Sequence, residues 1–110
     1  MNTLVPAPPE QVAKFRATLE PACVAVCQAH GLDPRECMAE AIALSGCGRF
    51  SVSHNYWHLP GRGSRGSYLA VVAPRVESIA NGGVAPQVEQ RAKFSTPHEA
   101  VEAWCRMRGA

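Results

Sequence analysis

The densest set of chemically useful side chains lies in SHNYWHLPG, residues 53–61. It holds two imidazoles (His54, His58), one carboxamide (Asn55) and two large aromatic rings (Tyr56, Trp57). Aromatic faces stack on sugar rings and amides hydrogen-bond to hydroxyl groups, so this mixture favours a carbohydrate-binding groove. Tyr56 and Trp57 also fit a second role, the filling of a small core, and the sequence leaves that alternative open.

The chain also carries five cysteines, an odd number in a sequence without a visible export signal, which predicts reduced and mostly buried thiols. Two of them are one helical turn apart, but the chain has no Cys-x-x-Cys pair, and the His-x-x-x-His spacing of His54 and His58 does not complete a metal site. The histidines of residues 53–61 have no carboxylate or thiol partner nearby in the sequence. We therefore expect no metal and no cofactor. The cysteines are Cys23, Cys27, Cys37, Cys47 and Cys105.

Length and composition predict one folded unit. The chain has 110 residues, of which 46% are apolar and 18% charged, and this composition is typical of a globular domain. We expect a loose, proline-rich lead-in at 1–8 and a single domain at 9–110. The net charge of +2 argues against nucleic-acid binding. No apolar run approaches the ~20 residues of a membrane span.

Two helices are expected in the first half. Apolar spacing indicates a helix from Glu10 that stops at Gly31, and Pro21 either kinks it or starts a second helix. Asp33 is a helix cap, Pro34 fits the first turn, and Glu36 can reach back to the cap. This second helix buries one apolar side and ends at a glycine-broken turn, SGCG at 45–48. Its buried side contains Cys37, Met38, Ala41 and Ile42.

The second half is expected to contain a loop-rich stretch at 50–73, a hairpin and a closing helix. The hairpin has arms at 75–80 and 87–94 around NGGVAP, because both arms alternate apolar and polar residues. The closing helix repeats the start signal of the earlier one with Thr96, Pro97 and Glu99. Its apolar stripe, together with Phe94, is expected in the core: Val101, Trp104, and Met107 or Cys105.

This order of elements resembles the glucosaminidase domain of bacterial peptidoglycan hydrolases, a lysozyme-like family that includes flagellar-type muramidases and autolysin N-acetylglucosaminidases. Three blocks carry the resemblance: GLDPRECMAEAIALSGCGRF at 31–50, HNYWHLPG at 54–61 and QRAKFSTPHEAVEAWCRM at 90–107. It covers the chain from about Pro9 to Met107. The resemblance implies a mainly α (α+β) fold, with a helical lobe and a small β-hairpin, and a bacterial or phage origin.

The departures from the family concern its chemistry. The family places a general-acid glutamate before Ser-Gly-x-Gly, and the resemblance puts Leu44 at that position. Leucine has no proton to give, and glycoside cleavage requires an acid at the leaving oxygen. Cys47 replaces a tryptophan of the family's groove, and Trp57-His58 replaces a Phe-Gly pair. We therefore expect an inactive member of this fold, with no catalytic residue.

Two carboxylates are fallback candidates for a relocated acid. Glu40 precedes Leu44 by four residues, on the same helix face but a turn, ~6 Å, further back; a solvated or capping role is the simpler interpretation. Glu77, in the first hairpin arm, is similar to a second acidic residue that some family members place across the cleft. An outward-facing strand position fits Glu77 equally well.

Three functional hypotheses remain. The first is an inactive glucosaminidase-like domain that binds peptidoglycan, another N-acetylglucosamine-containing glycan, or a partner protein. The second is an active peptidoglycan hydrolase that uses Glu77 or Glu40. The third is an interaction module of a phage or secretion system, with Leu44 and Cys47 as a small apolar patch. No signal peptide is visible, so we expect a chain that is cytoplasmic as synthesised and that, if it acts at the cell wall, reaches it by another export route. The candidate binding residues are Ser45, Cys47, His54, Asn55, Tyr56, Trp57 and Glu77.

Overall fold

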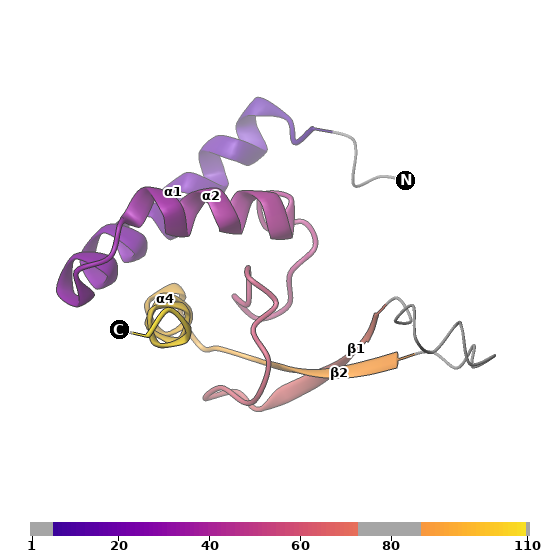
Figure 1. Cartoon of the computed structure of the whole chain (residues 1–110). Helices are drawn as coiled ribbons and strands as arrows, with labels where there is room; N and C mark the ends of the chain where they lie inside the picture. Colours follow the sequence, from indigo (N-terminus) through magenta and orange to yellow (C-terminus); the bar gives the residue numbers. More distant parts are fainter. Residues whose placement is uncertain (1–5, 73–86, 110) are drawn as a thin grey trace, which may run out of the picture.

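The computed structural model describes residues 6–72 and 87–109, and within them it contains three helices and one two-stranded sheet (Figure 1). The helices gather at one end of the molecule, and the strands extend from the other end beyond a long connecting loop. The fold is mainly helical with a small antiparallel sheet, which confirms the predicted fold class. Of the predicted lead-in, only residues 6–8 are described, and they belong to no helix or strand.

Helix α1, Pro9–His30, is a single helix that runs through Pro21. The alternative of two helices is therefore wrong. Proline removes one backbone hydrogen bond, but a stripe of buried side chains on both sides of it keeps the helix packed. The helix ends where predicted, because Gly31 adopts a left-handed φ of 71° and Leu32 N–H bonds back to the carbonyl of Cys27 at 2.8 Å.

Helix α2, Pro34–Ser45, begins with the predicted cap: the Asp33 carboxylate accepts from the Arg35 amide at 2.9 Å. Glu36 does not reach back to the helix cap, although the sequence predicted that it would. Its carboxylate binds Arg108, which follows the last helix, and does not complete a local capping box. The charged guanidinium of Arg108 is a stronger hydrogen-bond partner for this carboxylate than a neutral backbone amide.

Helix α4, Pro97–Met107, is capped by Thr96, whose side chain accepts from the Glu99 amide. The Glu99 carboxylate reaches one residue further than predicted, to the amide of Ser95 at 3.0 Å and the hydroxyl of Ser64 at 2.6 Å. These bonds lower the pKa of Glu99, the Ser64 hydroxyl contributing most. Val101, Trp104 and Cys105 are buried, whereas Met107 is 62% exposed, so Cys105 completes the stripe.

The sheet pairs β1, Ser67–Val72, with β2, Gln87–Ala92, from Ser67↔Ala92 to Val72↔Gln87. The predicted first arm, 75–80, lies outside the described residues. The described partner of β2 is instead a segment that was expected to be loop. The sequence SYLAVV hides its strand character because it is apolar on both faces, so no alternation marks it.

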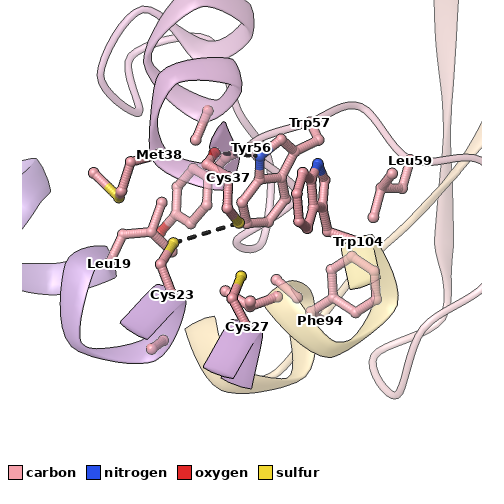
Figure 2. Close-up of a cluster of buried hydrophobic side chains, with 14 of the residues drawn as sticks. Leu19, Cys23, Cys27, Cys37, Met38, Tyr56, Trp57, Leu59, Phe94 and Trp104 are labelled. Atoms are coloured by element: carbon pink, nitrogen blue, oxygen red, sulfur yellow. Dashed lines mark hydrogen bonds between the residues drawn. The ribbon is translucent and has the colours of Figure 1, made fainter. Parts of the chain in front are cut away.

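The core forms where α1 contacts α2 and α4. Figure 2 shows that the connecting loop and the segment before α4 complete it with rings and aliphatic side chains. The Trp57 indole lies against that of Trp104, with ring centroids 6.3 Å apart, and donates its N–H to the Cys37 carbonyl at 3.0 Å. All five cysteines are free thiols and buried, as predicted.

These thiols predict a loss of stability in alkali. Burial raises the pKa of Cys27 and raises the pKa of Cys105 to about 12. In the unfolded chain both thiols titrate near pH 8.5, so above that pH the unfolded form binds fewer protons than the folded form. Their contribution is complete below about pH 8.5 and falls as the pH rises toward 12.

We expect the reduced protein to lose about 1 kcal/mol of unfolding free energy through Cys105 between pH 7 and about pH 9.5, and Cys27 to add to this loss. Urea unfolding in the presence of a reductant measures this. The double variant Cys27→Ala/Cys105→Ala should show a flatter pH dependence, and an equally steep one would contradict the assignment.

Candidate functional site

The turn after α2 is rigid. The buried Ser45 hydroxyl donates to the Ala41 carbonyl at 2.6 Å and accepts from the Gly48 amide at 2.9 Å. Gly46 and Gly48 have left-handed φ angles of 58° and 85°. A Cβ at Gly46 would come within 2.7 Å of the Phe50 ring. The two glycines therefore let the chain leave the helix sharply, and Ser45 is a structural residue of the turn.

Leu44 faces solvent just before this turn, with 46% of its surface exposed. Cys47 is buried in the core, although a patch of Leu44 and Cys47 was predicted. The exposed apolar residues at this end of α2 are instead Leu44, Phe50 and Val52. Leu44 is thus accessible to a ligand, and no buried side chain has to move to reach it.

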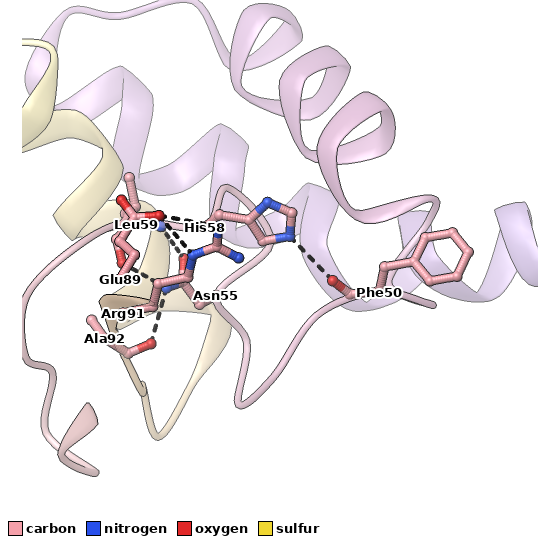
Figure 3. A network of polar contacts seen from close by, with 7 residues as sticks. All are labelled: Phe50, Asn55, His58, Leu59, Glu89, Arg91 and Ala92. Atoms are coloured by element: carbon pink, nitrogen blue, oxygen red, sulfur yellow. Dashed lines mark hydrogen bonds and ion pairs between the residues drawn. The ribbon is translucent and has the colours of Figure 1, made fainter. Parts of the chain in front are cut away.

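Asn55 joins the connecting loop to the sheet (Figure 3). Its amide group donates to the carbonyls of Leu59 and Ala92, both at 2.9 Å, and its carbonyl accepts from the Leu59 amide at 2.7 Å. The side chain is fully buried. Backbone groups thus occupy both amide hydrogens of Asn55 and bond to its oxygen. Little of the side chain is left to bind a glycan.

Tyr56 and Trp57 both fill the core, which resolves the alternative left open by the sequence. The Tyr56 and Phe15 rings form a T-shaped pair with centroids 5.2 Å apart, and the Tyr56 hydroxyl bonds to His54 Nδ1 at 2.9 Å. Burial raises the pKa of Tyr56. The predicted aromatic groove is therefore mostly packed inside the helical end.

His54 and His58 remain half-buried at the rim of the loop. Both have left-handed backbones, with φ of 64° and 53°, a conformation that strains residues with a Cβ. His58 Nε2 bonds to the Phe50 carbonyl at 3.1 Å, which holds the loop against the turn after α2.

The hairpin exposes its apolar face and turns its polar face inward, an arrangement that the sequence analysis did not predict. Leu69 and Val71 are 72% and 75% exposed, and Val88, opposite Val71, is also exposed. The other face is half-buried and carries Tyr68 and the ion pair of Glu89 with Arg91, at 3.1 Å. Figure 3 shows this pair beside Asn55 and His58. A polar face thus points toward the connecting loop, and an apolar face points away from it.

Of the two fallback acids, Glu40 lies within the described residues and its carboxylate has defined partners. Glu40 Oε1 accepts from the Trp104 indole N–H at 3.2 Å, and its other oxygen pairs with Arg108. Its carboxylate is therefore directed at the end of α4. Glu77 lies outside the described residues.

Within residues 6–72 and 87–109, no three histidine, cysteine, aspartate or glutamate side chains are placed to hold a metal ion. The helices described there are too short or too polar to cross a membrane.

The chain is similar in structure to the catalytic domain of the autolysin Auto from Listeria monocytogenes. The TM-score is 0.74 at 18% sequence identity, and the match covers 94% of this chain and 59% of that chain. At this identity the likeness establishes the fold. No protein-family model and no curated protein matches the sequence.

Asn55→Ala should lower the unfolding free energy by about 3 kcal/mol, because one carbonyl or amide left without its partner in the interior costs roughly 1–3 kcal/mol. Gln90→Ala, an exposed change on β2, is the matched control and should stay within about 0.5 kcal/mol of the wild type. Urea unfolding compares them. Equal effects would show that Asn55 does not anchor the loop.

Proposed function

We propose that this chain is a glucosaminidase-like domain without its catalytic acid, and that it binds glycan strands of peptidoglycan without cleaving them. The fold it shares with an autolysin catalytic domain supports the glycan class. The chain spans 59% of the solved autolysin chain, so residues outside this likeness can contribute to activity in that protein.

Leu44 is the observation that carries the proposal. It occupies the last turn of α2, directly before the Ser-Gly-x-Gly turn, and its side chain is open to solvent. A glutamate there could protonate a glycosidic oxygen, and general acid catalysis contributes about 10²–10⁴-fold in rate. A leucine at the same position can contact a sugar ring but cannot transfer a proton.

A relocated acid is the second hypothesis, and the surroundings of Glu40 weigh against it. The Glu40 carboxylate is engaged by the Arg108 guanidinium and the Trp104 N–H. An acid catalyst has to lie within hydrogen-bond reach of the leaving oxygen, whereas these two contacts direct the Glu40 carboxylate at the end of α4. Glu77 remains a candidate for this role.

The polar face of the hairpin is the second support for glycan binding. Tyr68, Glu89 and Arg91 offer one ring, one anion and one cation next to the connecting loop, which begins at the turn after Leu44. Sugars bind to such a mixture of stacking and hydrogen-bonding groups. The opposite face of the hairpin, with exposed Leu69, Val71 and Val88, is the one that would suit a protein partner.

A protein partner is the third hypothesis, and one group of exposed side chains supports it. Leu44, Phe50 and Val52 are exposed apolar side chains around one turn. A partner from a phage or a secretion system could cover them, and the domain would then not bind glycan at all.

Leu44→Glu tests the account directly. The position is exposed, so the change should alter the unfolding free energy by no more than about 1 kcal/mol. We expect the wild type to release no reducing ends from purified peptidoglycan and Leu44→Glu to release them. Leu44→Gln, which has the same size and no acidic proton, is the control and should stay inactive.

Turnover by the wild type would contradict the missing acid. A folded Leu44→Glu protein that neither cleaves nor binds peptidoglycan would favour the protein-partner hypothesis.

The two faces of β1 give a matched binding test. Tyr68→Ala removes a ring from the polar face, and Leu69→Ala removes a side chain from the opposite face. In co-sedimentation with insoluble peptidoglycan, Tyr68→Ala should weaken binding about tenfold, which corresponds to about 1.4 kcal/mol. Leu69→Ala should leave binding unchanged, and the reverse order would place the glycan on the wrong face.

A further inference from the structure

Four of the five cysteines meet in two pairs at the junction of the helices. Cys23 and Cys27 lie one turn apart on α1, Cys37 lies on α2 and Cys105 lies on α4. The Sγ atoms of Cys23 and Cys37 are 3.5 Å apart, and those of Cys27 and Cys105 are 3.9 Å apart. All four side chains are completely buried. Figure 2 shows the Cys23–Cys37 contact in the middle of the core.

This arrangement suits disulfides better than a metal. Within residues 6–72 and 87–109 no group of three or more histidine, cysteine, aspartate or glutamate side chains is placed to hold a metal ion. A disulfide needs a sulfur–sulfur distance of about 2.05 Å. Each pair therefore has to close by only about 1.5–2 Å, a movement that small side-chain rotations supply.

We propose that the chain forms two disulfides, Cys23–Cys37 and Cys27–Cys105, when it folds in contact with a disulfide donor such as glutathione disulfide or a thiol–disulfide oxidoreductase. One protein thiolate attacks the donor disulfide and releases the first donor thiolate. The partner thiolate of the pair then attacks this mixed disulfide and releases the second. For each bridge, two protein thiols are oxidised by two electrons, and one donor disulfide is reduced to two thiols.

Because the two cysteine pairs are buried in the folded chain, the exchange has to occur during folding. Thiolates, not thiols, attack disulfides, and burial raises the pKa of Cys27 and of Cys105 in the folded chain. A donor also cannot reach completely buried sulfurs. Exchange therefore precedes the closure of the helices, and the compartment in which the chain folds decides the redox state that the core keeps.

The bridges would tie α1 to both of its neighbours. Cys23–Cys37 joins residues 14 apart in sequence, and Cys27–Cys105 joins residues 78 apart. Cross-links of this span remove much of the conformational freedom of the unfolded chain. A domain that acts outside the cell gains lasting stability from them, because buried bridges resist reduction.

The test uses the full chain, denatured, reduced and then refolded either with a glutathione redox pair or with a reductant alone. Remaining thiols are alkylated in denaturant and counted by intact mass. We expect one alkyl group after oxidative refolding, on Cys47, and five after reductive refolding. Elastase peptides, cut between Cys23 and Cys27, should show the two proposed links. The oxidised form should melt at least about 10 °C higher.

Matched variants assign each bridge. Cys23→Ala/Cys37→Ala and Cys27→Ala/Cys105→Ala should each keep one link, and Cys47→Ala should keep both and take up no alkyl group. Five alkyl groups after oxidative refolding would overturn the proposal, as would a Cys27–Cys37 link or intermolecular links only. The count on the wild type needs no variant to fold. It also needs no glycan, so it stands or falls independently of the proposed function.

Discussion

The buried side chain of Asn55 is the contact on which the arrangement of the two ends of the molecule depends. Through three hydrogen bonds it joins the connecting loop to itself at Leu59 and to β2 at Ala92. The same loop sends Trp57 into the helical core, where its indole is bonded to Cys37 on α2. One short segment therefore fixes the hairpin relative to the helices, and with it the distance between the Leu44 turn and the polar hairpin face.

Local signals in the sequence predicted the helices well. Asp33 and Thr96 cap where expected, and Gly31 ends the first helix, because each of these devices acts within a few residues. The order of helix, helix, hairpin and helix was also predicted, but the observed first strand, Ser67–Val72, lies in a segment that was expected to be loop. Glu36 was assigned a local role, and its actual partner, Arg108, lies 72 residues away.

The candidate site was harder to predict, because side-chain burial depends on distant parts of the chain. The sequence SHNYWHLPG has the composition of a sugar groove, yet its amide and both large rings turn inward to hold the fold. Nothing within the segment reveals that Asn55 meets Ala92. The polar hairpin face was missed because β1 is apolar on both sides, so the sequence does not say which face points inward. The sequence alone identifies Leu44 as a side chain without an acidic proton, and the structure adds that this side chain is exposed at the end of α2.

We propose that the exposed Leu44 occupies the position from which an acid would donate a proton, and that the polar hairpin face binds the sugar. The most direct measurement is an NMR titration of the wild-type chain with a soluble chitooligosaccharide, followed over time. The account predicts amide shifts in the Leu44 turn and at Tyr68 and Arg91, with the ligand intact at the end. Cleaved ligand, or shifts confined to the face of Leu69 and Val71, would contradict it.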